Sequence, residues 1–488
     1  MIAHPTLIPL LSAIAESRVL CVGDVMLDRF ISGDVARISP EAPVPVLLIS
    51  AETEMLGGVG NVVRNLAGLG SAAALVATVG DDGAGRIVGE QLADLGDIDP
   101  ALVVDTARPT SIKTRYVAGN QQMLRADKEV TGSLAPDTAQ GLTAAAMSGL
   151  NDCGALVLSD YGKGVLGGGR AQDLIAAAKG AGKPVIVDPK GDDYSIYAGA
   201  DLITPNRKEL SEASGFVVNS VGTAVEAATS LLKQFDFGAV LVTLSHEGMV
   251  LVTPETSLHV PAEAREVFDV SGAGDTVVAT LASALAAGAE LPDAVKLANA
   301  AAGIVVGKVG TAAVYAAELV SALHHEEISR AEAKVLTLAE AKDRVEVWRR
   351  QGLKVGFTNG CFDLLHPGHV SLLDQSKAAC ERLIVGLNSD ASTARLKGPE
   401  RPVQSEAGRA TVLASLVSVD LVVVFEEDTP LEVIKALRPD VLVKGADYAK
   451  ADVVGAPEVE SWGGRVHLAD LQAGHSTTAT IERLTGGK

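Results

Sequence analysis

The sequence predicts two consecutive α/β domains, each with a mostly parallel sheet covered by helices. Short apolar runs rich in β-branched residues alternate with helical stretches, a pattern typical of strands that are buried on both faces. In the first part these runs are RVLCVGD, ALVLSD, PVIVDPK, DLITPN and AVLVTL; the second series is KVGFTNG, ERLIVGLNSD, DLVVVFEED, VLVKGADY and RVHLAD. A chain of 488 residues is also too long for one ordinary core.

Composition predicts a soluble, cytoplasmic protein and argues against a nucleic-acid or membrane protein. Lys and Arg number 41 against 61 Asp and Glu, which gives a net charge of −20, and no local basic patch offsets it. No apolar stretch is long enough to span a bilayer, and the N-terminus lacks the features of a signal peptide. The cysteines form no CxxC pair, so we expect reduced thiols rather than disulfides or a zinc site.

A change in character near residue 321 predicts the domain boundary. We expect a first domain over residues 1–322, a charged linker over 323–333, and a second domain over 334–488. Apolar residues spaced three or four apart predict one amphipathic helix after the linker: Val335, Leu338, Ala341, Val345 and Trp348.

In the first domain, the polar and glycine-rich segments follow the predicted strands. Because ligands bind at the carboxyl ends of strands in open α/β sheets, these segments should share one site. The stretch SGAGD places Asp275 after a small-residue turn at a helix start, where the carboxylate is either a cap or a base beside a phosphate. Asn206 and Glu209 are three apart, so on a helix they share a face and could orient Mg²⁺ or its waters.

These elements, in this order over about residues 18–320, resemble the ribokinase-like carbohydrate kinases. The resemblance implies that Asp275 is the catalytic base and that the backbone amides of Gly272, Ala273, Gly274 and Asp275 form an anion hole. It also implies sugar binding by Asp24, Asp28, Gly57, Gly58 and Asn61, ATP and Mg²⁺ binding by Asn206, Arg207, Lys208 and Glu209, and adenine near Asn299. A monovalent cation is a further possible cofactor.

Two alternating segments outside the main strand series, PVPVLLIS and PTSIKTRYVAGNQQMLRAD, predict a small β lid. Lys113, Arg115 and Arg125 lie in or beside it, and we expect some of them to contact a phosphate of the acceptor. Each could equally be a solvated surface charge.

In the second domain, the run VGFTNGCFDLLHPGHVSLL places His366 and His369 at a helix start after a strand that ends near Thr358. Two imidazoles there can donate to nucleotide phosphates and stabilise charge without acting as nucleophiles. A metal site is the alternative, although only Asp363 lies close in sequence as a third ligand.

This run resembles the nucleotidyltransferases with an H-x-G-H signature, which have a Rossmann-like fold. The resemblance implies that His366 and His369 act on phosphates and that Lys397 neutralises a triphosphate. The other implied nucleotide contacts are Thr358, Asn359, Gly360, Phe362, Asn388, Arg401, Arg409, Ser476, Thr477 and Thr478. The last three could also be a plain helix cap.

Together the halves resemble the bifunctional kinases and adenylyltransferases of ADP-heptose synthesis. That family implies ATP-dependent phosphorylation of heptose 7-phosphate at C1, adenylyl transfer from ATP to heptose 1-phosphate, and sugar phosphates and ATP as small-molecule partners. A different sugar kinase fused to a cytidylyltransferase, an inactive nucleotide sensor, and a chain with one active half are the alternatives. We expect a homodimer because the lid strands near residues 42–49 offer a free edge.

Overall fold

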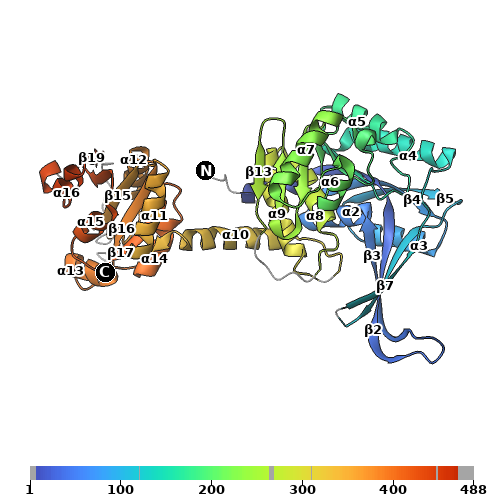
Figure 1. Ribbon diagram of the computed structural model, residues 1–488, viewed down its shortest axis with the longest axis horizontal. Coiled ribbons are helices and arrows are strands. Elements are labelled where there is room, and N and C mark those ends of the chain that lie inside the picture. The colour runs from blue at the N-terminus through green and yellow to red at the C-terminus, as the bar shows by residue number, and fades with distance from the viewer. Residues whose placement is uncertain (1–6, 120, 263–268, 309, 447–448, 471–488) are drawn as a thin grey trace, which may run out of the picture. The chain divides into compact units, whose positions relative to one another are not determined.

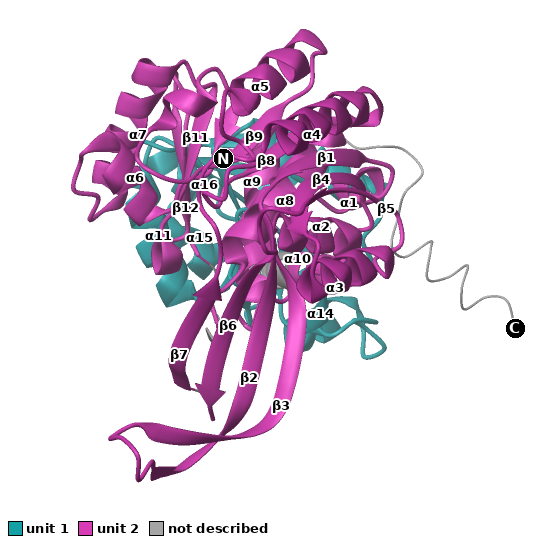
Figure 2. Cartoon of the chain, turned by 90° about the vertical axis from the view of Figure 1, so that its right-hand side faces the viewer, with its two compact units in different colours: residues 1–3, 324–488 teal, residues 4–323 magenta. Residues whose placement is uncertain are grey.

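The computed structural model describes residues 7–119, 121–262, 269–308, 310–446 and 449–470, without the side chains of residues 325–331 and 451. The described chain divides into two compact units, one up to residue 323 and the other from residue 324 onwards (Figures 1 and 2). Within the described ranges there are three sheets, of nine, four and six strands. No helix in those ranges is long and apolar enough to cross a bilayer.

The large sheet of the first unit is parallel except at one edge. Its order is β13 (Ser257–Val260), β12 (Met249–Val252), β11 (Ala239–Thr243), β10 (Leu202–Ile203), β9 (Val185–Asp188), β8 (Ala155–Ser159), β1 (Arg18–Gly23), β4 (Ala72–Gly80) and β5 (Ile98–Asp105). Strand β1 lies between β4 and β8, so the chain builds outwards from β1 in both directions. The carboxyl ends of β1 and β8 therefore flank a topological switch point, where α/β sheets form a ligand crevice.

Helices cover both faces of this sheet, which explains why its strands are apolar throughout. One core packs beneath α1 (Leu7–Ile14), α2 (Val59–Leu69), α3 (Gly83–Ala93), α8 (Ala273–Ala286), α9 (Leu291–Val305) and part of α10 (Ala316–Glu332). The other packs beneath α4 (Pro136–Gly149), α5 (Arg170–Gly180), α6 (Arg207–Ser214) and α7 (Val221–Phe235).

The lid sheet is formed by β3 (Pro45–Gly58), β2 (Val25–Ile38), β6 (Ser111–Ala118) and β7 (Gln121–Lys128), in that order. Figure 2 shows these strands projecting from the rest of the unit. Both predicted lid segments belong to it. The long strand β2 was not among the predicted lid segments; its 14 residues begin at Val25, directly after Asp24.

The second unit has a parallel sheet of β14 (Val335–Leu336), β17 (Leu421–Phe425), β16 (Arg382–Asn388), β15 (Val355–Gly360), β18 (Val441–Gly445) and β19 (Arg465–Ala469), in that order. Helices α11 (Leu338–Arg350), α15 (Leu431–Leu437) and α16 (Ala456–Ser461) pack against one core, and α12 (Pro367–Ala378) and α14 (Glu406–Ala414) against another. Helix α13 (Asp390–Lys397) follows β16. Strand β15 lies between β16 and β18, which again creates a switch point at its carboxyl end.

The predicted amphipathic helix is present as α11, in which Ala341, Val345 and Trp348 are buried. Its expected start was wrong: Val335 belongs to β14 and pairs with Val422, because Thr337 caps the helix and ends the strand. Most of the segment expected as a charged linker, residues 323–333, is helical, because α10 continues to Glu332.

Candidate functional sites

Asp275 lies in the first turn of α8, and its side chain is almost fully buried. Its two carboxylate oxygens accept hydrogen bonds from different parts of the unit. The Nδ2 of Asn61, on α2, donates to Oδ2 at 2.7 Å, and the hydroxyl of Tyr161, in the loop after β8, donates to Oδ1 at 2.8 Å. The carboxylate is therefore held at a helix N-terminus, where backbone N–H groups suit an anion.

Gly272 is required at this helix start for two reasons. Its φ of 80° lies in the left-handed region, and a Cβ added there would come within 2.7 Å of Asn61 Nδ2. Of the expected anion-hole amides, that of Ala273 donates to the carbonyl of Val270 at 3.3 Å.

Burial raises the pKa of Asp275 to about 6, against the opposing hydrogen bonds from Asn61 and Tyr161. Asp28 raises this pKa further, whereas Lys113 lowers it. A carboxyl group in this range is ionised at neutral pH yet basic enough to take a proton, which is what a general base requires.

Asp24 follows β1 and holds the loop that carries Tyr161. Its carboxylate accepts from the backbone N–H groups of Tyr161 and Lys163, both at 2.9 Å, and of Val165 at 3.3 Å. The side chain that we expected to bind sugar thus has both oxygens engaged by the protein backbone. Desolvation raises its pKa.

Sequence reasoning missed two polar residues of this site, Tyr161 and Asp188. Tyr161 follows the predicted strand run ALVLSD, and Asp188 lies in the run PVIVDPK, but their partners in the site become neighbours only in three dimensions. Asp188 ends β9, and burial, followed by the charge of Asp275, raises its pKa well above the ordinary value.

At the base of the lid, Arg115 forms an ion pair with Asp28, with 2.8 Å between Nη1 and Oδ1, and both side chains are largely buried. Lys113 lies over the ring of Tyr161, 5.0 Å from its centroid, and desolvation lowers its pKa. Arg125 is opposite Arg115 in the strand register, but its side chain is 54% exposed and pairs with Asp127.

Two glycines shape the start of α2. A Cβ on Gly57 would lie 2.6 Å from Asp28 Oδ2, and one on Gly58, whose φ is 59°, would lie 2.3 Å from the carbonyl oxygen of Asp24. The glycine pair therefore allows the two aspartates and the helix start to approach one another.

Asn206 and Glu209 form a reciprocal capping box at the start of α6. Asn206 Oδ1 accepts from the N–H groups of Lys208 and Glu209 at 2.9 and 3.0 Å, and Glu209 Oε2 accepts from the N–H of Asn206 at 3.1 Å. Glu209 Oε1 accepts from Lys190 Nζ at 2.9 Å. Asn206 Oδ1 has both lone pairs engaged and does not suit a Mg²⁺ ligand, whereas each Glu209 oxygen accepts one hydrogen bond and retains a lone pair for a metal-bound water.

Of the other expected ATP-binding residues, Arg207 and Lys208 begin α6 directly after the cap, and Asn299 lies on another helix. Arg207 is ion-paired with Glu247, and the exposed Lys208 faces Glu212 at 3.6 Å. Asn299, on α9, is buried and donates to the carbonyl of Pro261 at 3.0 Å.

In the second unit, the two histidines lie at the start of α12. His366 is the N-cap, and its Nδ1 accepts from the backbone N–H of His369 at 3.3 Å. The neutral His366 ring therefore carries its hydrogen on Nε2, from which it can donate. The two imidazole rings stack with centroids 3.8 Å apart, and desolvation together with His366 lowers the pKa of His369 to about 4.

The carboxyl end of β15 holds polar atoms suited to a ligand. Thr358 Oγ1 and Asn359 Oδ1 are buried and have no hydrogen-bond partner among the described residues. Phe362, with φ of 41°, packs against His369 with ring centroids 5.1 Å apart, and a Cβ on Gly360 would approach its ring at 3.2 Å. Unpartnered buried oxygens are costly, so this strand end fits a polar ligand such as a nucleotide.

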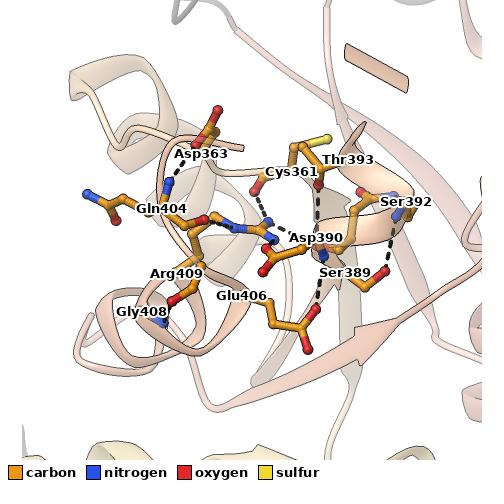
Figure 3. A network of polar contacts seen from close by, with 12 residues as sticks. Cys361, Asp363, Ser389, Asp390, Ser392, Thr393, Gln404, Glu406, Gly408 and Arg409 are labelled. Atoms are coloured by element: carbon orange, nitrogen blue, oxygen red, sulfur yellow. Dashed lines mark hydrogen bonds and ion pairs between the residues drawn. The ribbon is translucent and has the colours of Figure 1, made fainter. Parts of the chain in front are cut away.

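Arg409, expected to contact nucleotide, is instead fully buried in a polar network (Figure 3). Its guanidinium donates to the carbonyls of Cys361, Asn388 and Gln404 at 2.5, 2.9 and 3.1 Å, and to Asp390 Oδ1 at 2.7 Å. These contacts join the ends of β15 and β16 to the loop before α14. Arg409 therefore supports the site and has little freedom to bind phosphate.

The remaining expected residues of this unit differ in accessibility. Asp363 is buried, pairs with Arg401, and accepts from the N–H of Val403 at 2.6 Å. Asn388 is also buried and donates to Ser392 Oγ at 3.0 Å, whereas Lys397 is exposed at the end of α13. Ser476, Thr477 and Thr478 lie outside the described residues. In the described part of the chain, no cluster of three or more His, Cys, Asp or Glu is arranged for a metal ion.

Comparisons with known proteins agree with this two-part organisation. The pfkB family of carbohydrate kinases matches residues 16–317, and the cytidylyltransferase-like family matches residues 357–480. Phosphofructokinase-2 from Escherichia coli, solved with substrates and products, has a similar fold: the TM-score is 0.53 at 23% identity, and the match covers 63% of this chain and 99% of that one.

Curated relatives match over nearly the full length. The bifunctional protein HldE of Paramagnetospirillum magneticum is 62% identical over 96% of both chains. The protein of the same name from Rhodospirillum rubrum is 57% identical, with 99% of this chain and 98% of the relative covered. The chain therefore belongs to the family of bifunctional HldE proteins, and it combines a pfkB-family carbohydrate kinase with a cytidylyltransferase-like nucleotidyltransferase.

Proposed function

We propose that the chain carries out two reactions of ADP-heptose synthesis. The first unit phosphorylates heptose 7-phosphate at C1 with ATP, and the second transfers AMP from ATP to heptose 1-phosphate and releases pyrophosphate. The observation that supports the kinase assignment most strongly is the buried Asp275 carboxylate at the start of α8, held by two donors. Because the second reaction uses a monophosphate, a phosphatase must remove the 7-phosphate in between.

In the kinase reaction, Asp275 takes the proton of the C1 hydroxyl as that oxygen attacks the γ-phosphate of ATP. The first-turn amides of α8 stabilise the negative charge on the transferred group. Mg²⁺ would neutralise phosphate charge when bound; Glu209 would hold it through water, and Asn206 would support Glu209 through the capping box.

In the second unit, catalysis depends on positioning and charge stabilisation. The Nε2–H of His366 donates to a phosphate of ATP, and the buried oxygens of Thr358 and Asn359 accept from donors on the bound nucleotide or sugar phosphate. Exposed Lys397 is free to fold over the triphosphate.

The 7-phosphate of the first substrate requires cations near the lid. We assign this role to Lys113 and Arg125, with Arg115 as a partner that is already paired with Asp28. Replacing Arg125 by Met should raise the KM for heptose 7-phosphate about tenfold, since the charge-assisted contact with the 7-phosphate is lost, and should leave the KM for ATP unchanged, since ATP does not make that contact. An unchanged KM for the sugar phosphate would exclude Arg125 from the clamp.

Two point variants test the whole proposal. Asp275→Asn should abolish formation of the bisphosphate, and His366→Ala should abolish only ADP-heptose formation; phosphorus NMR of the products distinguishes the two. Loss of both activities in either variant would contradict two independent sites.

The nucleotide is tested separately. Pyrophosphate release should require ATP and heptose 1-phosphate, and activity with CTP instead would favour the alternative of a cytidylyltransferase. We further propose a cytoplasmic homodimer; sedimentation of the purified chain tests its oligomeric state.

A further inference from the structure

Tyr161 donates its hydroxyl hydrogen to Asp275 Oδ1, and it has no role in the reaction as described so far. We propose that Tyr161 is a positioning residue for the kinase: its hydroxyl orients the Asp275 carboxylate and marks Oδ1 as the atom that takes the substrate proton. This inference rests on the proposed role of Asp275 as the base.

The two donors on Asp275 differ in what they can do. The group facing Oδ2 is the amide nitrogen of Asn61, since the amide oxygen in that place would face a carboxylate oxygen. An amide nitrogen only donates, and it donates more strongly to a charged oxygen than to a hydroxyl, so this contact disfavours a proton on Oδ2. A phenol both donates and accepts, so Oδ1 can be protonated with Tyr161 still in contact.

The position of Tyr161 is set by the protein rather than by a ligand. Asp24 accepts from the backbone N–H groups of Tyr161 and Lys163. On the other side of the same loop, Asp160 Oδ1 accepts from the N–H of Gly162 at 2.7 Å, and Asp160 Oδ2 accepts from the hydroxyl of Tyr197 at 2.6 Å. Two buried carboxylates thus fix the loop, and through it the phenol.

The proton can be followed through the step. The O–H bond of the acceptor hydroxyl breaks, and its proton forms an O–H bond with Asp275 Oδ1. The electron pair left on the acceptor oxygen forms the new O–P bond. The bond from the γ-phosphorus to the bridging oxygen breaks, and ADP leaves with the electrons of that bond. Tyr161 keeps its proton, and its pKa is raised well above the ordinary value by burial and by Asp275. As Oδ1 becomes a hydroxyl, the phenol oxygen can turn to accept from it.

Other charged groups also act on this site, so the effect of Tyr161 must be separated from theirs. The titratable and charged groups that face Asp275 from the surrounding elements are Asp28 on β2, Arg64 on α2, Lys113 on β6 and Asp188 on β9. None of these loses or gains a partner when only the phenol oxygen is removed from Tyr161.

The experiment is the pH profile of kinase kcat/KM for Tyr161→Phe. We expect kcat to fall about tenfold, with a KM for the sugar phosphate within about twofold of the parent. The acidic limb should move up by about one pH unit, because a donor to the charged carboxylate is lost. Adenylyl transfer by the same chain should be unchanged.

A matched control removes another buried phenol from the same unit. Tyr194 is fully buried, and its hydroxyl has no hydrogen-bond partner in the described ranges, so Tyr194→Phe should leave the kinase pH profile in place. If Tyr161→Phe fails to fold, a ring-fluorinated tyrosine at position 161 replaces it. That stronger donor should move the acidic limb to lower pH, opposite to the shift for Phe.

An acidic limb that stays in place in both the Phe and the fluorotyrosine proteins would overturn this inference. Failure of the underlying function gives a different result, since Asp275→Asn would then retain kinase activity. If Asp275→Asn is inactive and Tyr161→Phe has the parent profile, the base is correct and the role of Tyr161 is wrong.

Discussion

Asn61 Nδ2 lies 2.7 Å from Asp275 Oδ2, although 214 residues separate the two in the chain. This bond joins α2 to α8 at the carboxyl end of the large sheet. A second bond joins the same helices, because Thr276 Oγ1 donates to Asn65 Oδ1 at 2.9 Å. The proposed base is thus fixed by a paired helix as well as by its own turn.

The turn before Asp275 should tolerate no side chain at Gly272. Gly272→Ala adds a Cβ 2.7 Å from Asn61 Nδ2 to a backbone with φ of 80°, so we expect loss of most kinase activity and about 1–3 kcal/mol of stability. Gly288→Ala is the control: its φ is 83°, but nothing lies within 4 Å. Kinase assays and thermal melting of both variants separate the effect of the contact with Asn61 from the effect of backbone strain at positive φ. An equal loss of activity in both variants would assign the effect to backbone strain alone.

Kinase activity should depend on the ionisation of Asp275. Because burial raises its pKa to about 6, the base is progressively protonated as the pH falls below that value. We expect kcat/KM of the kinase to rise with pH up to about 6 and then to level off, and adenylyl transfer should not share this limb. The test covers about one pH unit on either side of the expected pKa, from about pH 5 to about pH 7. A kinase kcat/KM that stays constant over that range would contradict the assignment of Asp275 as the base.

The capping box of α6 provides a test of Mg²⁺ binding. Glu209→Gln keeps an acceptor oxygen for the cap, so it should lower the free energy of unfolding by less than about 1 kcal/mol. Because it removes the charge, it should raise the Mg²⁺ concentration needed for half-maximal kinase activity. Thr337 and Glu340 form the same motif on α11, so Glu340→Gln is the matched control. An unchanged Mg²⁺ dependence for Glu209→Gln would assign Glu209 to the cap alone.

Removing the buried guanidinium of Arg409 should disable the second unit. Arg409→Met leaves three backbone carbonyls without this donor, so we expect the free energy of unfolding of the second unit to fall by about 3 kcal/mol. Adenylyl transfer should be lost, and kinase activity should be retained. Arg395, which is half-exposed and pairs with Asp428, is the control; Arg395→Met should change stability by less than about 1 kcal/mol. Calorimetry and both assays measure these effects, and a fully stable but inactive Arg409→Met would point instead to a direct nucleotide contact.

The amino-acid sequence was sufficient to predict much of this architecture. Buried parallel strands are apolar throughout, so RVLCVG and ALVLS could be recognised as β1 and β8 from their residues alone. Turn and helix-start chemistry is equally local, which is why the glycine before Asp275 and the Pro-Gly between the two histidines could be placed correctly.

Partners that are far apart in the chain could not be predicted in this way. The ends of β1 and β8 meet only because β1 lies between β4 and β8, and this order depends on crossovers and packing rather than on any local pattern. Only the tertiary structure therefore showed that Tyr161 donates to Asp275 and that Lys190 donates to Glu209. It also showed that the buried Arg409 donates to carbonyls at the ends of β15 and β16. Side-chain hydrogen bonds of this kind depend on which strands and helices the fold brings together, so the residue types suggest candidates, and the fold decides which of them face the reacting atoms.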